Sequence, residues 1–199
     1  MGKIAADIVL LPDESMIEAV ISANGELVSR SGSEIVLNKA TCLPHISLAM
    51  GCIEESDVDE MEGVLAKIAS AKRWGLLRAV GTRIGTNAAG EKISLIEIER
   101  SEQLQRLHEE IMEAMGTYFK YEVSREMIWG GGGVAESTLK WISDYAEKSS
   151  FEEFFPHITV GYGEAKGGSF PMEFAVSSLA LCHLGNHCTC REVLLSIEL

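Results

Sequence analysis

Two segments of this chain repeat one unusual pattern of residues. Residues 43–51 are LPHISLAMG and residues 155–163 are FPHITVGYG. In each copy aliphatic residues alternate with the histidine and the hydroxyl residue, and this period of two predicts a strand with one apolar face. The proline before each histidine lacks an N–H donor, which suits the first residue of a strand. A fold that keeps both copies has to bring two equivalent strands together.

The remaining hydrophobic periodicity predicts an α+β fold with antiparallel pairing, because neighbouring strands are joined as hairpins. We expect a hairpin with a polar turn at residues 85–90, and a short strand at 34–37. Expected strands cover residues 3–11, 41–50, 76–84, 92–99, 172–183 and 191–199, and expected helices cover 14–23, 56–71, 101–119 and 135–148. A motif followed by a hairpin in each half favours a single domain, residues 1–199, with two lobes.

Composition restricts the class of protein. The chain has 199 residues, of which 46% are hydrophobic and 24% charged, as in ordinary globular proteins. No apolar run reaches the roughly 20 residues of a membrane span. Asp7, followed by Pro12-Asp13-Glu14, argues against a signal peptide, so we expect a cytoplasmic protein. The five cysteines include no C-x-x-C pair and are interpreted as reduced thiols.

The net charge of −13 argues against extended contact with a nucleic-acid backbone. A locally basic pocket can still bind a small phosphate. We therefore expect the partner to be a small nucleotide or an RNA end, with no extended nucleic acid and no membrane, and we expect a monomer.

The paired motif suits phosphoryl chemistry. Histidine titrates near pH 6.5, so His45 and His157 can divide the proton transfers that open a cyclic phosphodiester with water. Ser47 and Thr159 would then donate hydrogen bonds to the phosphate oxygens. Two imidazoles and two hydroxyls are a poor zinc set, and neither motif has a carboxylate on its histidine face. We expect no metal and no cofactor.

The two motifs resemble the tandem H-x-[ST]-hydrophobic signatures of the two-histidine (2H) phosphoesterase superfamily, which includes 2′-5′ RNA ligase-like proteins and cyclic phosphodiesterases. The resemblance implies an α+β fold with two pseudo-symmetric lobes of antiparallel sheet and outer helices around a central cleft. It also implies that His45 and His157 are the acid/base pair and that Ser47 and Thr159 bind phosphate, although serine stands at 47 where threonine is common. It implies action on 2′,3′-cyclic phosphates or 2′-5′ linkages, usually without metal, and we expect hydrolysis of a 2′,3′-cyclic phosphate on a nucleotide or an RNA end. A 2′-5′ RNA ligase-type activity and a non-catalytic nucleotide-binding role are the alternatives.

Other residues are open to more than one interpretation. Arg125 and Trp129 are candidates for substrate binding through phosphate contact and base stacking, and core packing is an equal reading for Trp129. Gly130–Gly133 is interpreted as a flexible loop or an anion site. His108 is interpreted as a solvated flank of a helix. Residues 182–190 (CHLGNHCTC) are interpreted as a plain turn, with a metal or redox site as the alternative.

Overall fold

The computed structural model describes residues 2–32, 34–72, 74–86, 90–166 and 168–199. Its strands are β1 (Lys3–Pro12), β2 (Ile46–Glu54), β3 (Leu77–Thr86), β4 (Lys92–Ile98), β5 (His157–Tyr162), β6 (Met172–Phe174), β7 (Val176–Leu184) and β8 (Cys190–Glu198). Its α-helices are α1 (Glu14–Ser31), α2 (Val58–Ser70), α3 (Glu102–Met115) and α4 (Glu136–Lys148). Short 3-10 turns are η1 (Glu55–Asp57), η2 (Arg125–Met127), η3 (Phe151–Glu153) and η4 (Asn186–Cys188).

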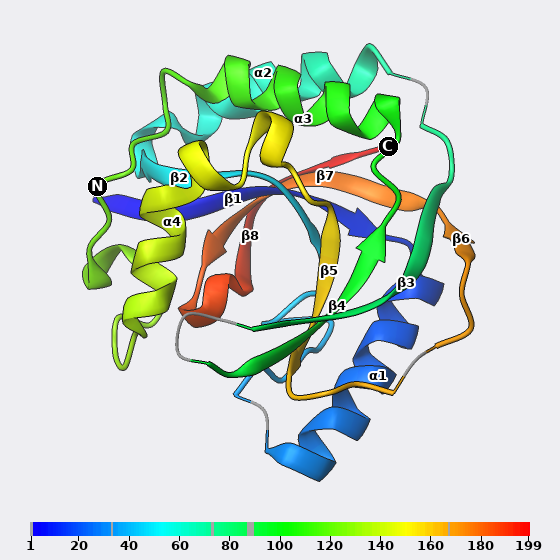
Figure 1. Cartoon of the computed structure of the whole chain (residues 1–199). Helices are drawn as coiled ribbons and strands as arrows, with labels where there is room; N and C mark the ends of the chain where they lie inside the picture. Colours follow the sequence, from blue (N-terminus) through cyan, green and yellow to red (C-terminus); the bar gives the residue numbers. More distant parts are fainter. Residues whose placement is uncertain (1, 33, 73, 87–89, 167) are drawn as a thin grey trace.

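The strands of the described residues form one curled antiparallel sheet in the order β6-β3-β4-β5-β2-β1-β7-β8 (Figure 1). This order is symmetric about the contact between the motif strands β2 and β5. A β-bulge follows each motif hydroxyl, since the register shifts beside the pairs Val9–Ser47 and Leu95–Thr159. The prediction of an α+β fold with two pseudo-symmetric lobes is therefore confirmed.

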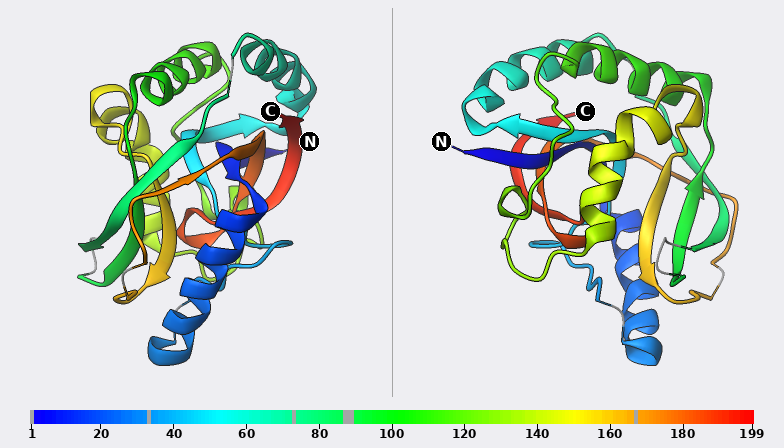
Figure 2. Two further views of the ribbon diagram at one scale, coloured as in Figure 1. Left: turned by 90° about the vertical axis from the view of Figure 1, so that its right-hand side faces the viewer. Right: turned by 60° about the vertical axis from the view of Figure 1, so that its left-hand side comes forward.

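Helices α1, α2 and α3 cover the face of the sheet that lies opposite the histidines, whereas α4 packs beside η4. α2 and α3 lie side by side across the lobe that contains β2 and β8, while α1 packs mainly against β5 of the other lobe (Figure 2). α1 follows β1 in sequence, so it crosses from one lobe to the other. α3 makes the reciprocal crossing, because it follows β4 and packs against β2. The main core lies between these helices and the sheet.

Capping residues set the start of two helices as predicted. The Asp13 carboxylate accepts a hydrogen bond from Met16 N at 2.9 Å, and the Ser101 hydroxyl accepts one from Leu104 N. α1 continues past the end expected at Asn24-Gly25 and stops at Gly32, whose φ of +67° suits glycine. The side chain of Asn24 bonds to other segments instead of ending the helix.

The structure differs from the expected elements in two further places. Residues 34–37 form no strand, because the Asn24 amide binds the Ile35 carbonyl and Leu37 N–H. The strand expected over 172–183 is divided into β6 and β7. Within the expected hairpin turn, residues 87–89 lie outside the described residues.

Candidate active site at the joint between the lobes

The two motif strands are neighbours at the centre of the sheet. Ile46 of β2 pairs with Ile158 of β5, and both side chains are fully buried. The predicted alternation is present in both strands: the aliphatic residues face the core, while His45, Ser47, His157 and Thr159 are partly exposed on the opposite face. An antiparallel register through this pair sets His45 opposite Thr159 and His157 opposite Ser47. The fold thus brings all four predicted residues together.

Each imidazole is oriented by the backbone of its own motif. His45 Nδ1 lies 2.8 Å from the Leu43 carbonyl oxygen, and His157 Nδ1 lies 2.7 Å from the Phe155 carbonyl oxygen. A carbonyl oxygen accepts only from a protonated nitrogen, so Nδ1 carries the hydrogen in both rings. Nε2 is consequently the atom of each ring that is left to take or give a proton.

Burial favours the neutral form of both imidazoles. Desolvation lowers the pKa of His45 and of His157, while the carbonyl bonds at Leu43 and Phe155 partly oppose this shift. The charge of His157 lowers the pKa of His45 further, because the two rings are close enough to repel when both are protonated. A site with one protonated and one neutral ring is the arrangement that a general acid and a general base require.

The two hydroxyls have different partners. Ser47 Oγ donates a 2.6 Å hydrogen bond to Asp7 Oδ2, whereas Thr159 Oγ1 has no hydrogen-bond partner within the described residues. Asp7 lies in the middle of β1 with 0% of its surface exposed, and burial raises the pKa of its carboxyl well above the ordinary range. Sequence reasoning missed this residue. Its signal was a lone acidic residue inside the apolar run KIAADIVLL.

A small cavity lies between the two motifs. It has a volume of about 20 Å³, which is room for roughly one water molecule. Its lining includes His45 and Thr159 on one side and the apolar Ile35, Leu37 and Leu43 on another. Residues 34–43, which we call the strap, supply this apolar wall. Asn24 fastens the strap to β5, since its amide also donates to the Val160 carbonyl at 2.7 Å.

A third histidine lines the cavity from the lobe that contains β2. His187 of η4 has a left-handed backbone (φ 60°) and lines the cavity. Its Nδ1 lies 2.9 Å from the Tyr162 hydroxyl, and its Nε2 lies 2.8 Å from a Glu34 carboxylate oxygen. The turn at 185–187, interpreted from the sequence as a plain turn, therefore carries a histidine that bonds to the strap through Glu34 and to β5 through Tyr162.

Arg125 and Trp129 lie away from this cavity. Arg125 forms an ion pair with Glu136 at the surface. The Trp129 ring packs under the Arg191 guanidinium, 4.9 Å from its centroid, and its backbone N–H bonds to the Leu184 carbonyl. Neither residue belongs to the lining of the cavity beside the histidines.

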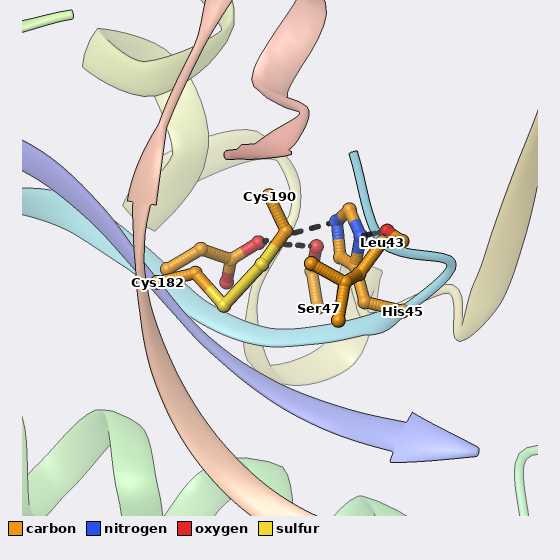
Figure 3. Close-up of a disulfide and its surroundings, with 6 residues drawn as sticks. Leu43, His45, Ser47, Cys182 and Cys190 are labelled. Carbon is orange, nitrogen blue, oxygen red and sulfur yellow. Dashed lines mark hydrogen bonds and ion pairs between the residues drawn. A yellow bond between two sulfur atoms is a disulfide. The ribbon is translucent and has the colours of Figure 1, made fainter. Parts of the chain in front are cut away.

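The interpretation of all five cysteines as reduced thiols is wrong for two of them. Cys182 of β7 and Cys190 of β8 form a disulfide, with their Cα atoms 5.5 Å apart. The bond lies beside the first motif: Leu43 N donates to the Cys190 carbonyl, and the Leu43 carbonyl in turn binds His45 (Figure 3). Pairing of neighbouring strands explains the contact, which spacing along the chain alone does not reveal. Cys42, Cys52 and Cys188 are free.

His108 is also placed differently from the prediction. It is fully buried rather than solvated, with Nδ1 bonded to the Leu48 carbonyl and Nε2 accepting from Phe151 N. Its ring stacks on Phe154 at 4.0 Å. The signal was present in the helix, because position 108 lies four residues after Leu104 and three before Ile111, within the apolar stripe.

Comparison with known proteins identifies a similar fold. No protein-family profile matches the sequence, and no curated protein matches it. The fold is similar to that in the crystal structure of TT0787 of Thermus thermophilus, with a TM-score of 0.62 and 15% identity over 98% of each chain. At this identity the likeness extends to the fold alone.

Two features are absent from the described residues. Among them, no helix is long and apolar enough to cross a membrane. The same residues contain no group of three or more His, Cys, Asp or Glu side chains arranged to hold a metal ion.

Proposed function

We propose that this protein is a phosphodiesterase of the two-histidine kind, which hydrolyses a 2′,3′-cyclic phosphate on a small nucleotide or an RNA end without a metal. The observation that carries the proposal is the matched orientation of His45 and His157. Each ring is held through Nδ1 by a carbonyl two residues upstream, so both Nε2 atoms are left for catalysis on one face of the sheet. This arrangement supports the activity that the resemblance to the two-histidine phosphoesterases implies.

The chemistry needs two proton transfers. One Nε2 takes a proton from water as its oxygen bonds to phosphorus, and the other Nε2 gives a proton to the ribose oxygen as the bond from that oxygen to phosphorus breaks. The Thr159 hydroxyl, which has no other partner among the described residues, donates to a non-bridging phosphate oxygen. The cavity, with a volume of about 20 Å³, is too small for a nucleotide. The base therefore has to lie at the mouth of the cavity or displace the strap.

The test is turnover of a panel of 2′,3′-cyclic mononucleotides and a cyclic-phosphate-ended oligonucleotide, with EDTA present. We expect wild type to hydrolyse at least one of them, and His45→Ala and His157→Ala to lose at least about 100-fold in kcat. His183→Ala is the matched control, because His183 binds the Met127 carbonyl and does not line the cavity. A folded wild-type protein that turns over none of the panel would contradict the proposal and favour a binding role.

A further inference from the structure

The two lobes differ in one carboxyl group close to the motif histidines. Asp7 lies on β1 beside the first motif, with its side chain fully buried. Oδ2 accepts the Ser47 hydrogen bond, while Oδ1 has no hydrogen-bond partner in the described part of the chain. A buried carboxyl with one unpaired oxygen costs free energy unless a neighbour compensates for it. A residue of this kind in the middle of an apolar strand points to a functional role.

The available neighbour is the reactive nitrogen of His45. His45 Nε2 lies 3.9 Å from Asp7 Oδ2, and the His45 side chain keeps only 12% of its surface exposed. Because Nδ1 is held by the Leu43 carbonyl, the ring cannot turn Nε2 away without losing that bond. Figure 3 shows Leu43, His45 and Ser47 grouped beside the Cys182–Cys190 disulfide.

The second motif has no equivalent of this contact. In the described residues no carboxylate lies within ion-pair distance of His157, and only burial and the Phe155 carbonyl shift its pKa. Glu97 of β4 lies opposite His157 in the strand register, but the two side chains form no ion pair. Neither Glu97 nor Asp7 is a cause of the lowered pKa of its neighbouring histidine, so the two motifs differ in distance: of these two carboxyl groups, only Asp7 lies within 4 Å of a nitrogen of a motif imidazole. Of the two imidazoles, only His45 has a described carboxyl group beside Nε2.

The other groups that face Asp7 carry no positive charge. Tyr145 of α4 and Cys188 of η4 are both close enough for Asp7 to raise their pKa, beyond the larger effect of burial. Cys182, the cross-strand neighbour of Asp7 on β7, is in the disulfide and does not titrate. η2 also contacts β1, but its Arg125 and Glu126 are exposed to solvent. His45 is therefore the one described group able to form an ion pair with Asp7.

We propose that Asp7 is a positioning residue that shares one proton with His45, and that this makes His45 the proton donor of the reaction and His157 the acceptor. The assignment of proton donor and acceptor rests on the proposed function, whereas the shared proton does not depend on it. In the resting pair the proton is on either the carboxyl or Nε2. During hydrolysis Nε2–H of His45 passes it to the departing ribose oxygen, while His157 Nε2 takes one from water. His157 then releases its proton to solvent, and solvent returns a proton to the pair of Asp7 and His45.

The decisive experiment is NMR, which needs no substrate. The ring of His45 and the carboxyl carbon of Asp7 are titrated in wild type, and both are expected to show one common inflection. In Asp7→Asn, the titration midpoint of His45 is expected to fall by about one pH unit. The reason is that the variant lacks the carboxylate, whose opposite charge favours the protonated ring in wild type. His157 is expected to change less. Glu97→Gln is the matched control and is expected to leave both histidines unchanged.

The kinetic readout then assigns the role. An acid must be protonated, so the high-pH limb of kcat/KM in Asp7→Asn is expected to move to lower pH while the low-pH limb stays in place. A shift of the low-pH limb alone would make His45 the base and overturn the assignment.

Separate inflections of Asp7 and His45 in wild type would overturn the shared proton even if Asp7→Asn did not fold, since that measurement uses no variant. A protein with a shared inflection but no turnover of any cyclic phosphate would refute the proposed function and leave the Asp7–His45 pair established.

Discussion

Ile46 of β2 and Ile158 of β5 lie directly opposite each other, and this pair of residues joins the two lobes of the sheet. Because this one pair sets the register of both strands, it also decides that each histidine lies opposite the hydroxyl of the other lobe. An anion at the joint would meet an imidazole and a hydroxyl from both sides. The core contact and the geometry of the candidate site therefore depend on the same two residues.

Shortening Ile158 should weaken the joint strongly. Ile158→Ala removes buried methyl groups at the pair that connects β2 with β5, so we expect a loss of about 3 kcal/mol in the free energy of unfolding. Urea denaturation measures the loss. Val36→Ala is the control, since Val36 is 55% exposed and should change stability by no more than about 0.5 kcal/mol. Equal effects of the two variants would contradict this account of the joint.

Removing the Asn24 amide should release the strap. Asn24→Ala leaves the carbonyls of Ile35 and Val160 and the N–H of Leu37 without their buried partner. We expect a loss of about 3 kcal/mol, because each unpaired buried group costs roughly 1–3 kcal/mol. Limited proteolysis should cut within residues 34–43 before the rest of the chain unfolds. Val36→Ala, at an exposed position of the same strap, should leave that cleavage rate nearly unchanged.

The two hydroxyls should contribute unequally to turnover. Thr159→Val removes a donor that has no other described partner and should lower kcat for a cyclic phosphate by about 100-fold. Ser47→Ala should cost less, because the Ser47 hydrogen is already donated to Asp7. Steady-state kinetics on both variants decides the order. A larger loss for Ser47→Ala would mean that Ser47 turns from Asp7 to the phosphate during the reaction.

Asp7 and Asp13 should have opposite effects on stability as pH changes. Burial raises the pKa of Asp7 above its unfolded value, so its stabilising contribution is present at low pH and is lost as pH rises from about 4 toward the folded value. We expect Asp7→Asn to match wild type in Tm near pH 4 and to exceed it by a few degrees at pH 7.

Asp13 is the control of opposite sign. Burial raises its pKa, but bonds from Met16 N, Ser15 and Ala175 N outweigh this effect and lower it overall. Its stabilising contribution is therefore present at neutral pH and is lost as pH falls. We expect Asp13→Asn to lose about 1 kcal/mol at pH 7 and little near pH 3. Thermal unfolding at both pH values tests the pair of variants, and parallel curves for both would contradict the assigned shifts.

Local patterns in the sequence were sufficient for the motif strands. The alternation in residues 43–51 and 155–163 predicts which side chains face the core, and the same pattern predicts four residues that the fold brings together. Strand pairing depends on residues far apart in the chain, and those contacts leave weaker signals. Asp7 belongs to the site only because β1 lies beside β2, and Cys182 meets Cys190 only because β7 and β8 form a hairpin.

The last glycine of each motif shows what a repeated sequence pattern does not reveal. A Cβ on Gly51 would lie 2.9 Å from the Phe119 ring, so glycine is needed there for close packing. Gly163 has a φ of +107°, so glycine is needed there for its backbone conformation. The two positions match in the repeat, and yet the physical reasons for the residue differ.

The exchange of helices between lobes has a consequence for how the chain becomes native. α1 and α3 each leave one lobe and pack on the other, so neither half of the polypeptide contains the helix that covers its own motif strand. Fragments cut between β2 and β3 would each expose an uncovered apolar sheet. The protein should therefore gain its structure in one cooperative and comparatively slow event, governed by contacts between distant parts of the chain.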